Sequence, residues 1–294
     1  MRGAEPFACS TQDGHSLAAV RFAPLVPPGP PVRTQAILVA GALGVPQRHY
    51  APFAQWLAGR GCHAMTFDLR GMGASLPAGQ SVRTVEADML SWARVDFSAT
   101  VDALRQWSGA ETVTVIGHSL GAHLPAMTTA ATQGRIAAVV SVAAGAGYWR
   151  DWAVPSRRKA PLMLHLAGPL LTPLFGYFPG KRIGMVADLP AGVMRQWSRW
   201  CRHPGFAWGA EPDALAASVE GARYRIHAVS FSDDEAMTQD CTRKLLAAQP
   251  NARSSLEVIT PQAMGAARIG HLGAFRSEHA ARLWPYLHGL ATGP

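Results

Sequence analysis

The residues best suited to catalysis lie at positions 117–121, which read Gly-His-Ser-Leu-Gly. They follow residues 112–116, an alternating β-branched run that predicts a strand, and they precede residues 120–132, whose pattern predicts a helix. A serine between two glycines at such a junction can sit on a very tight turn that exposes its hydroxyl above the end of the strand. Ser119 is therefore the predicted nucleophile.

The same turn predicts how a negative charge on a substrate carbonyl would be stabilised. The backbone N–H of Leu120 lies at a helix N-terminus, where the backbone dipoles favour an anion. A second donor is expected from the loop at residues 40–44, which follows the predicted strand 35–40 and is rich in small residues. We predict the N–H of Ala42 as this donor, with that of Leu43 as the alternative.

A serine nucleophile needs a base, and the base needs an orienting acid. His271 lies between glycines in a loop after the last predicted strand, residues 255–260, and is the predicted base. His118 and His123 are expected to flank the site without serving as the base. Their spacing does not fit two metal ligands one helical turn apart, so no metal is predicted.

The acid is expected after the predicted strand 224–231, where three carboxylates follow one another: Asp233, Asp234 and Glu235. We favour Asp234, because the run Asp-Glu-Ala-Met-Thr fits an acid at the head of a loop. Asp233 stays open as the alternative, since one of these residues can instead cap the next helix. The order serine, aspartate, histidine differs from the orders of chymotrypsin and subtilisin.

The elements that must position these residues alternate between apolar runs and helical patterns, which predicts an α/β fold with a mostly parallel sheet flanked by helices. Tyr50, Phe53 and Leu57 repeat at helical spacing, as do Phe97, Val101 and Leu104. The other predicted elements are a hairpin turning at residues 13–14, helices at 46–61 and 235–248, strands at 62–67 and 136–142, and a last helix from Ser277.

The alternation of predicted strands and helices stops between residues 148 and 210. We therefore predict a core of residues 1–147 and 211–294, with a helical lid, residues 148–210, inserted in it. Residues 160–180 contain no Asp, Glu, Lys or Arg and are long enough to cross a bilayer. Four prolines and His165 are expected to break a single helix there, so no stable membrane span is predicted.

The composition narrows the possible partners. Apolar residues make up 48% and charged residues 16% of the chain, which is typical of a protein with a large core. The formal net charge is +8, but the arginines are scattered, so we expect no nucleic-acid partner. The cysteines are far apart and the N-terminal residues lack the apolar core of a signal peptide; both features favour a reducing cytoplasm.

These signatures together resemble those of the α/β-hydrolase superfamily. Residues 68–75, Asp-Leu-Arg-Gly-Met-Gly-Ala-Ser, look like the D-x-R-G-x-G-x-S segment that follows the fourth strand in many members. The chain looks most like bacterial serine aminopeptidase-like and monoacylglycerol lipase-like hydrolases, whose lid follows the sixth strand. It departs from many members at Ala40, where they have histidine before the glycine of the oxyanion loop.

The resemblance implies two-step acyl transfer without a cofactor, in which Ser119 attacks and water then hydrolyses the acyl-enzyme. The charge-free stretch in the lid favours an apolar small-molecule substrate. We therefore expect a hydrolase of carboxylic esters, or of thioesters. An amidase or peptidase of the same fold, and a catalytically silent binding protein, are the alternatives.

Overall fold

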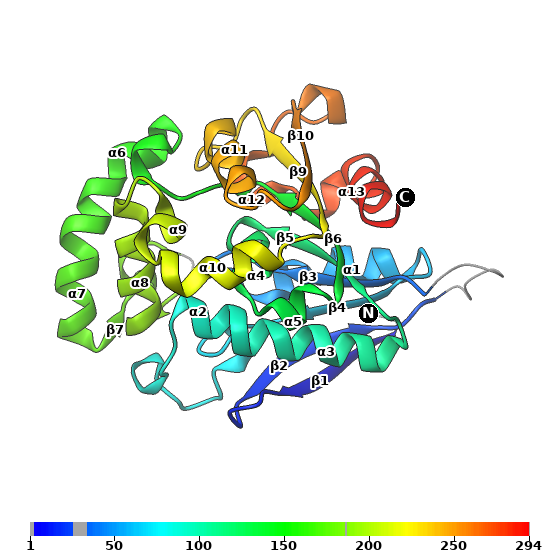
Figure 1. Ribbon diagram of the computed structural model, residues 1–294, viewed down its shortest axis with the longest axis horizontal. Coiled ribbons are helices and arrows are strands. Elements are labelled where there is room, and N and C mark those ends of the chain that lie inside the picture. Colours follow the sequence, from blue (N-terminus) through cyan, green and yellow to red (C-terminus); the bar gives the residue numbers. More distant parts are fainter. Residues whose placement is uncertain (1–2, 26–33, 186, 294) are drawn as a thin grey trace.

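The computed structural model describes residues 3–25, 34–185 and 187–293, which form helices on both faces of a central sheet (Figure 1). The sheet has eight strands in the order β1-β2-β4-β3-β5-β6-β9-β10. The first two pairings, β1 with β2 and β2 with β4, are antiparallel, and all later ones are parallel. The strands are β1 (Ala4–Ser10), β2 (Ser16–Phe22), β3 (Ala36–Ala40), β4 (His63–Phe67), β5 (Val113–His118), β6 (Ile136–Val142), β9 (Arg225–Phe231) and β10 (Arg253–Ile259).

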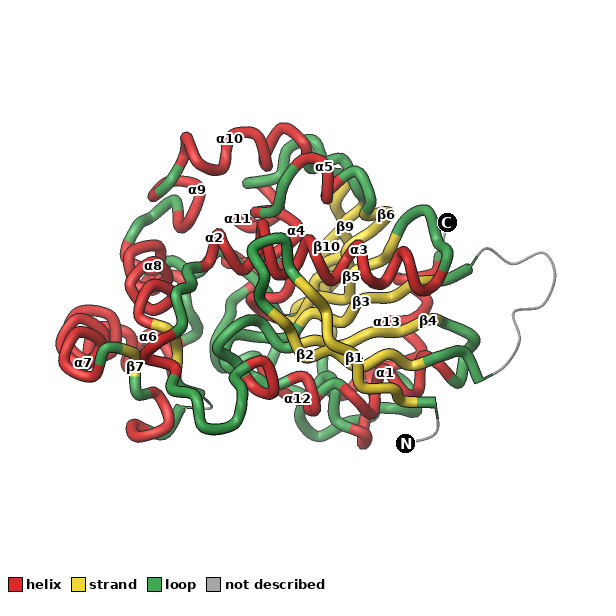
Figure 2. Tube along the Cα trace, turned by 90° about the horizontal axis from the view of Figure 1, so that it is seen from below, coloured by secondary structure: helices red, strands yellow, loops and turns green. Residues whose placement is uncertain are grey.

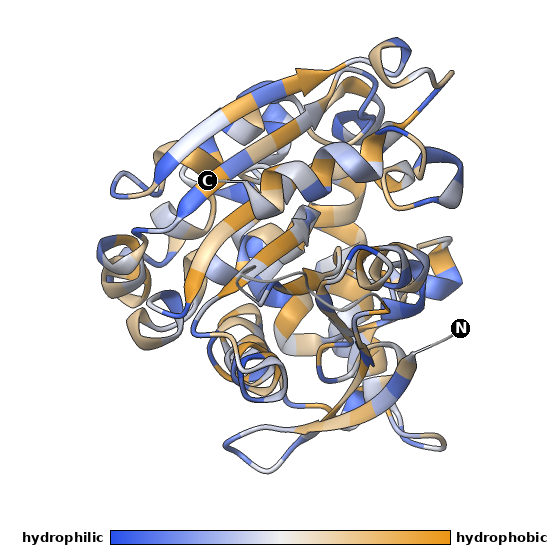
Figure 3. Cartoon of the chain, turned by 90° about the vertical axis from the view of Figure 1, so that its right-hand side faces the viewer, coloured by the Kyte–Doolittle hydropathy of each residue, from blue (hydrophilic) through white to orange (hydrophobic). Residues whose placement is uncertain are grey.

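Alternate residues of the strands face opposite layers of helices. In β3, Leu38 packs into one apolar cluster while Ile37 and Val39 pack into the other. Helices α1 and α13 cover the second face and α3 covers the first, as Figure 2 shows from below. Hydrophobic residues run along the central strands, which are buried on both sides (Figure 3). The α-helices of the core are α1 (Ala51–Ala58), α2 (Met89–Ser91), α3 (Phe97–Ser108), α4 (Leu124–Met127), α5 (Ala130–Gln133), α10 (Pro212–Gly221), α11 (Gln239–Ala247), α12 (Gly270–Gly273) and α13 (Leu283–Thr292).

The predicted fold class is confirmed, and most of the predicted strands lie within two residues of their expected ends. The hairpin at residues 13–14 joins β1 to β2. The helix expected at residues 46–61 is shorter, because a 3₁₀ turn (Gln47–His49) precedes α1. The last helix begins at Leu283 rather than at Ser277.

The prediction of one helix over residues 120–132 is wrong. Helix α4 ends at Met127 because Thr128 is extended, with ψ 179°. Thr129 then begins α5 by accepting a hydrogen bond from the N–H of Thr132 on its side-chain oxygen. Threonine competes with the helix in this way through its hydroxyl, so two short helices replace one long helix.

Residues 68–75 form a hydrogen-bonded loop after β4. The Asp68 carboxylate accepts hydrogen bonds from the N–H groups of Gln47 and Ala74, at 2.8 and 2.9 Å. Arg70 is buried and pairs with the fully buried Asp96, its Nε lying 2.7 Å from Oδ1. Asp96 comes from a π-helical turn (Trp92–Asp96) that joins α2 to α3. The pair of Arg70 and Asp96 therefore connects the loop after β4 to the start of α3.

Residues 148–210 lie between β6 and the helix α10. They are mostly helical and also contain a two-stranded antiparallel sheet. Figure 1 shows this insertion at the left, beside the central sheet. Its elements are α6 (Val154–Pro161), α7 (Gly168–Phe175), β7 (Tyr177–Phe178), β8 (Leu189–Pro190), α8 (Ala191–Arg202) and α9 (Phe206–Ala210).

The prolines do not break the helix of the insertion, contrary to the prediction. Helices α6 and α7 are joined by a π-helical stretch (Leu162–Ala167) and run on from residue 154 to residue 175. Pro161, Pro169 and Pro173 all lie on the exposed side, where the carbonyls that lose an N–H partner can reach water. Among the described residues, no helix combines the length and the apolar character needed to cross a membrane.

Candidate active site

Ser119 lies on a strained turn at the end of β5, at the centre of the sheet. Its backbone φ is 51°, in the left-handed region that residues other than glycine rarely adopt. A Cβ on Gly117 would lie 2.6 Å from the backbone of Ala122, and one on Gly121 would lie 2.1 Å from the carbonyl oxygen of Ala40. Only glycine fits at either position, as the sequence suggested for so tight a turn.

Three of the predicted site residues come together in one hydrogen-bonded row. His271 Nε2 lies 3.1 Å from Ser119 Oγ. The other ring nitrogen, Nδ1, lies 2.9 Å from Asp234 Oδ2. The Asp234 side chain is only 1% exposed, and its Oδ1 also accepts hydrogen bonds from the N–H groups of Ala236 and Met237. These backbone bonds fix the carboxylate so that it holds the imidazole in one orientation.

The two carboxylates beside Asp234 bind the backbone of the histidine loop instead. Asp233 Oδ2 accepts hydrogen bonds from the N–H groups of Ile269 and Gly270, at 2.8 and 3.1 Å. Glu235 Oε2 accepts one from the N–H of His271, at 3.1 Å. Of the two aspartates that the sequence left open, only Asp234 contacts the imidazole. Its neighbours hold the loop that carries it.

The backbone donor predicted at Ala42 is already engaged. Its N–H donates to the hydroxyl oxygen of the buried Tyr50, at 2.8 Å. The preference for Ala42 over Leu43 is therefore not supported by the geometry, because this amide points to a side chain of the protein. Sequence reasoning placed Tyr50 only on the buried face of a helix and gave its hydroxyl no role. Leu43 and Leu120 both line the cavity beside Ser119.

Tyr50 connects this loop to the histidine loop through His118. Its hydroxyl lies 2.8 Å from His118 Nδ1, and His118 Nε2 lies 2.8 Å from the carbonyl oxygen of His271. Because a carbonyl can only accept, the proton is on Nε2, and Nδ1 accepts the hydrogen bond from the tyrosine. His118 is fully buried, and burial, followed by the nearby His271, lowers its pKa to about 3. The neutral ring thus links both loops of the site.

His123 also flanks the site and lines the same cavity as Ser119. Its ring nitrogens lie 3.1 Å from the carbonyl oxygen of Ser119 and 3.0 Å from that of Gly145. Burial lowers its pKa. In the part of the chain that the structure describes, no three His, Cys, Asp or Glu side chains gather as metal ligands.

A cavity of about 320 Å³ opens over the serine and the histidine. Its core side is formed by the loop after β3, the turn at Ser119 and the residues around His271. The insertion covers the other side with mostly apolar side chains. The lining residues from the insertion are Trp152, Ser156, Met163, Met185, Trp197 and Phe206.

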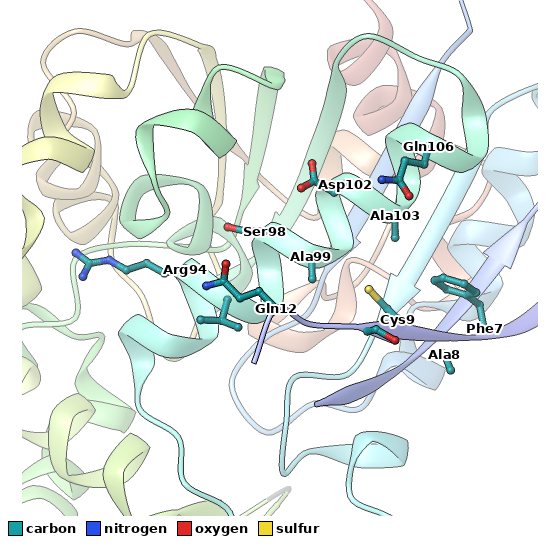
Figure 4. Close-up of a pocket in the computed structure, with 12 residues that line it drawn as sticks. Phe7, Ala8, Cys9, Gln12, Arg94, Ser98, Ala99, Asp102, Ala103 and Gln106 are labelled. Carbon is teal, nitrogen blue, oxygen red and sulfur yellow. The ribbon is translucent and has the colours of Figure 1, made fainter. Parts of the chain in front are cut away.

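A second hollow, of about 460 Å³, lies between β1 and α3, and Figure 4 shows the residues that line it. Its charged side chains are engaged with the protein. Arg94 donates a hydrogen bond to the carbonyl of Ala214, and Asp102 pairs with Arg135. The cavity beside Ser119 is therefore the stronger candidate for an active site.

This combination of sheet, strained serine turn and histidine loop is that of an α/β hydrolase. Residues 14–283 match the model of the alpha/beta hydrolase family, and the chain belongs to that family. No curated protein matches the sequence.

Solved structures share the fold at low sequence identity. The Pyrococcus furiosus esterase Pf2001 is 13% identical with a TM-score of 0.58, over 99% of this chain and 91% of the esterase. The α/β hydrolase GrgF from Penicillium is 17% identical with a TM-score of 0.57, over 98% and 97% of the two chains. Est1E from Butyrivibrio proteoclasticus is 14% identical with a TM-score of 0.55, over 98% of each chain.

The lowered pKa of His118 predicts an acid-dependent loss of stability. In the unfolded chain this imidazole has an ordinary pKa of about 6.5, so between this value and about 3 the unfolded state binds the additional proton. The free energy of unfolding therefore falls as the pH falls through this window. From about pH 6.5 to pH 4.5, we expect His118 to account for about 2 kcal/mol of this loss.

Urea unfolding of the wild type and of His118→Gln at both pH values measures this contribution. Glutamine offers an amide donor and a carbonyl acceptor without titrating. The wild type should lose about 2 kcal/mol more than the variant between the two pH values. Equal losses in the two proteins would show that His118 is not held neutral.

Proposed function

We propose that the chain is a serine hydrolase that cleaves a carboxylic ester of a hydrophobic small molecule through an acyl-enzyme on Ser119. The observation that carries this proposal is the hydrogen-bonded row from Ser119 through His271 to Asp234 at the base of an apolar cavity. A hydroxyl, an imidazole and a buried carboxylate in this order form a nucleophile, its general base and the group that orients the base.

In the first step, Ser119 Oγ attacks the ester carbonyl and His271 Nε2 accepts the hydroxyl proton. The C–O bond then breaks, and the imidazolium donates that proton to the departing alcohol, which leaves the acyl group on the serine. In the second step, His271 removes a proton from water, which attacks the acyl carbon. The bond to Ser119 Oγ then breaks, the imidazolium returns its proton to this oxygen, and the carboxylic acid leaves. Asp234 stabilises the imidazolium in both steps without itself taking the proton.

The negative charge of the tetrahedral intermediates needs backbone donors. We assign them to Leu120 and Leu43. Leu120 is at the N-terminal end of a helical turn, where N–H groups have no partner within the helix. Leu43 takes the place first predicted for Ala42, because Tyr50 binds the N–H of Ala42 and so fixes the loop that presents the next amide.

The lining of the cavity supports an apolar acyl or alcohol group. Trp152, Met163 and Trp197 of the insertion line the same cavity as Ser119, which supports the view of residues 148–210 as a lid over the site. Oxygen and sulfur esters of one acyl group would bind alike here, so a thioester is compatible with the same steps.

The role of the acid can be tested by changing each aspartate separately. Asp234→Asn should lower kcat for a p-nitrophenyl ester by roughly 10³-fold or more, because the imidazole loses its orienting charge. Asp233→Asn retains an oxygen that can accept the hydrogen bonds from Ile269 and Gly270, so its kcat should stay within about tenfold of wild type. A larger loss in Asp233→Asn than in Asp234→Asn would overturn the assignment.

The substrate class can be tested with p-nitrophenyl esters of increasing acyl length. Each buried methylene contributes about 0.8 kcal/mol, so kcat/KM should rise up to about fourfold per methylene until the cavity is full, and then fall. Met163→Ala enlarges the cavity and should move the optimum to longer chains. Leu170→Ala, on the exposed side of the same helical segment, is the matched control and should leave the optimum unchanged.

The matching anilides and thioesters separate the remaining alternatives. Faster turnover of the anilides would favour an amidase or peptidase. A folded wild type that turns over none of the three series would favour a silent binding protein.

A further inference from the structure

The long helical segment of the insertion carries a row of leucines on its outer side. Leu162, Leu166, Leu170 and Leu174 follow at four-residue spacing and are 63%, 50%, 58% and 74% exposed. We call these four residues the leucine face. Of the eight large hydrophobic residues that are exposed in the described part of the chain, six fall between residues 154 and 183. Five of these six, all but Ile183, lie on the helical segment from residue 154 to residue 175.

Packing within the protein does not account for the leucine face. The inner side of the same segment is formed by Ala160, Leu164, Gly168 and Thr172, all buried. This side lies against α8, where Ser198 donates a hydrogen bond to the carbonyl of Leu164 at 3.1 Å. The two sets are offset by two residues, which puts them on opposite sides of the helix. The segment therefore has a complete inner contact and a separate apolar outer face.

Positive charges stand at both ends of the leucine face. Arg157, Arg158 and Lys159 lie just before it, and Lys181 and Arg182 lie just after it, all of them exposed. There is no Asp or Glu between residues 152 and 187. None of the five cations forms an ion pair with a described residue. An apolar strip bounded by cations matches a surface that is apolar inside and anionic at its boundary.

We propose that the leucine face docks on an anionic lipid surface, with the leucines among the acyl chains and the flanking cations at the phosphates. Charge argues against a second copy of the chain as the occupant. Whether two leucine faces met parallel or antiparallel, a cationic end of one would face a cationic end of the other. Phosphate groups instead neutralise both ends.

The placement of the helix permits this docking. Figures 1 and 2 both show α7 at the margin of the molecule, on the far side of the insertion from the central sheet. The π-helical stretch contributes Met163 to the cavity over Ser119. A docked helix would therefore place the cavity next to the lipid. The docking itself does not depend on catalysis and is tested without it.

The test is flotation of the purified full chain with vesicles of phosphatidylcholine, with or without phosphatidylglycerol. We expect binding to the anionic vesicles that weakens as the salt concentration rises. Leu166→Ser/Leu170→Ser should lower this binding by about tenfold or more, and Lys181→Gln/Arg182→Gln should lower it for anionic vesicles only. Val258→Ser removes an exposed hydrophobic residue of β10, away from the insertion, and should bind as the wild type does.

Because all the substituted residues are exposed, the variants should keep the wild-type unfolding curve, which circular dichroism checks. A wild type that fails to float with anionic vesicles would overturn the proposal, as would a Leu166→Ser/Leu170→Ser variant that binds them equally well. A dimer in light scattering that Leu166→Ser/Leu170→Ser abolishes would also overturn it, since a second copy would then cover the leucine face.

Discussion

The strained turn at Ser119 is the constraint on which the rest of the site depends. Its left-handed backbone brings Gly121 so close to Ala40 that no side chain fits between them. The turn and the end of β3 are therefore positioned against each other by direct backbone contact. Tyr50 and His118 extend this arrangement by hydrogen bonds to the loop at Ala42 and to the loop of His271. The strained backbone of Ser119 is thus held in place by contacts with the surrounding structure.

Much of the fold could be predicted, because the spacing of apolar residues along the chain reflects which side of each helix or strand is buried. The β-branched runs gave the central strands, and the spacing of Phe97, Val101 and Leu104 gave α3. The errors came from local backbone conformations that the spacing of apolar residues does not reveal. The backbone at Thr128 interrupts a helix that otherwise has the right spacing. The insertion keeps its helix through several prolines because they face water.

The site could be predicted in part. Flanking glycines and a strand-to-helix junction identify Ser119 as a candidate without any structure. The choice between Asp233 and Asp234 could not be made, because both follow the same strand and only the folded loop shows which carboxylate meets the imidazole. Likewise, the engagement of Ala42 depends on Tyr50, whose hydroxyl reaches the loop only after α1 has packed. Such contacts of single side chains produce no regular spacing of residues from which they could be predicted.

The central claim is that Ser119 is an activated nucleophile. It is tested most directly by the intact mass of the protein after treatment with a fluorophosphonate, which reacts with the hydroxyl of an activated serine. The wild type should gain one phosphonyl group, mapped by peptide sequencing to Ser119, and a folded Ser119→Ala variant should gain none. A folded wild type that remains unmodified, or a Ser119→Ala variant that is still labelled, would contradict this account.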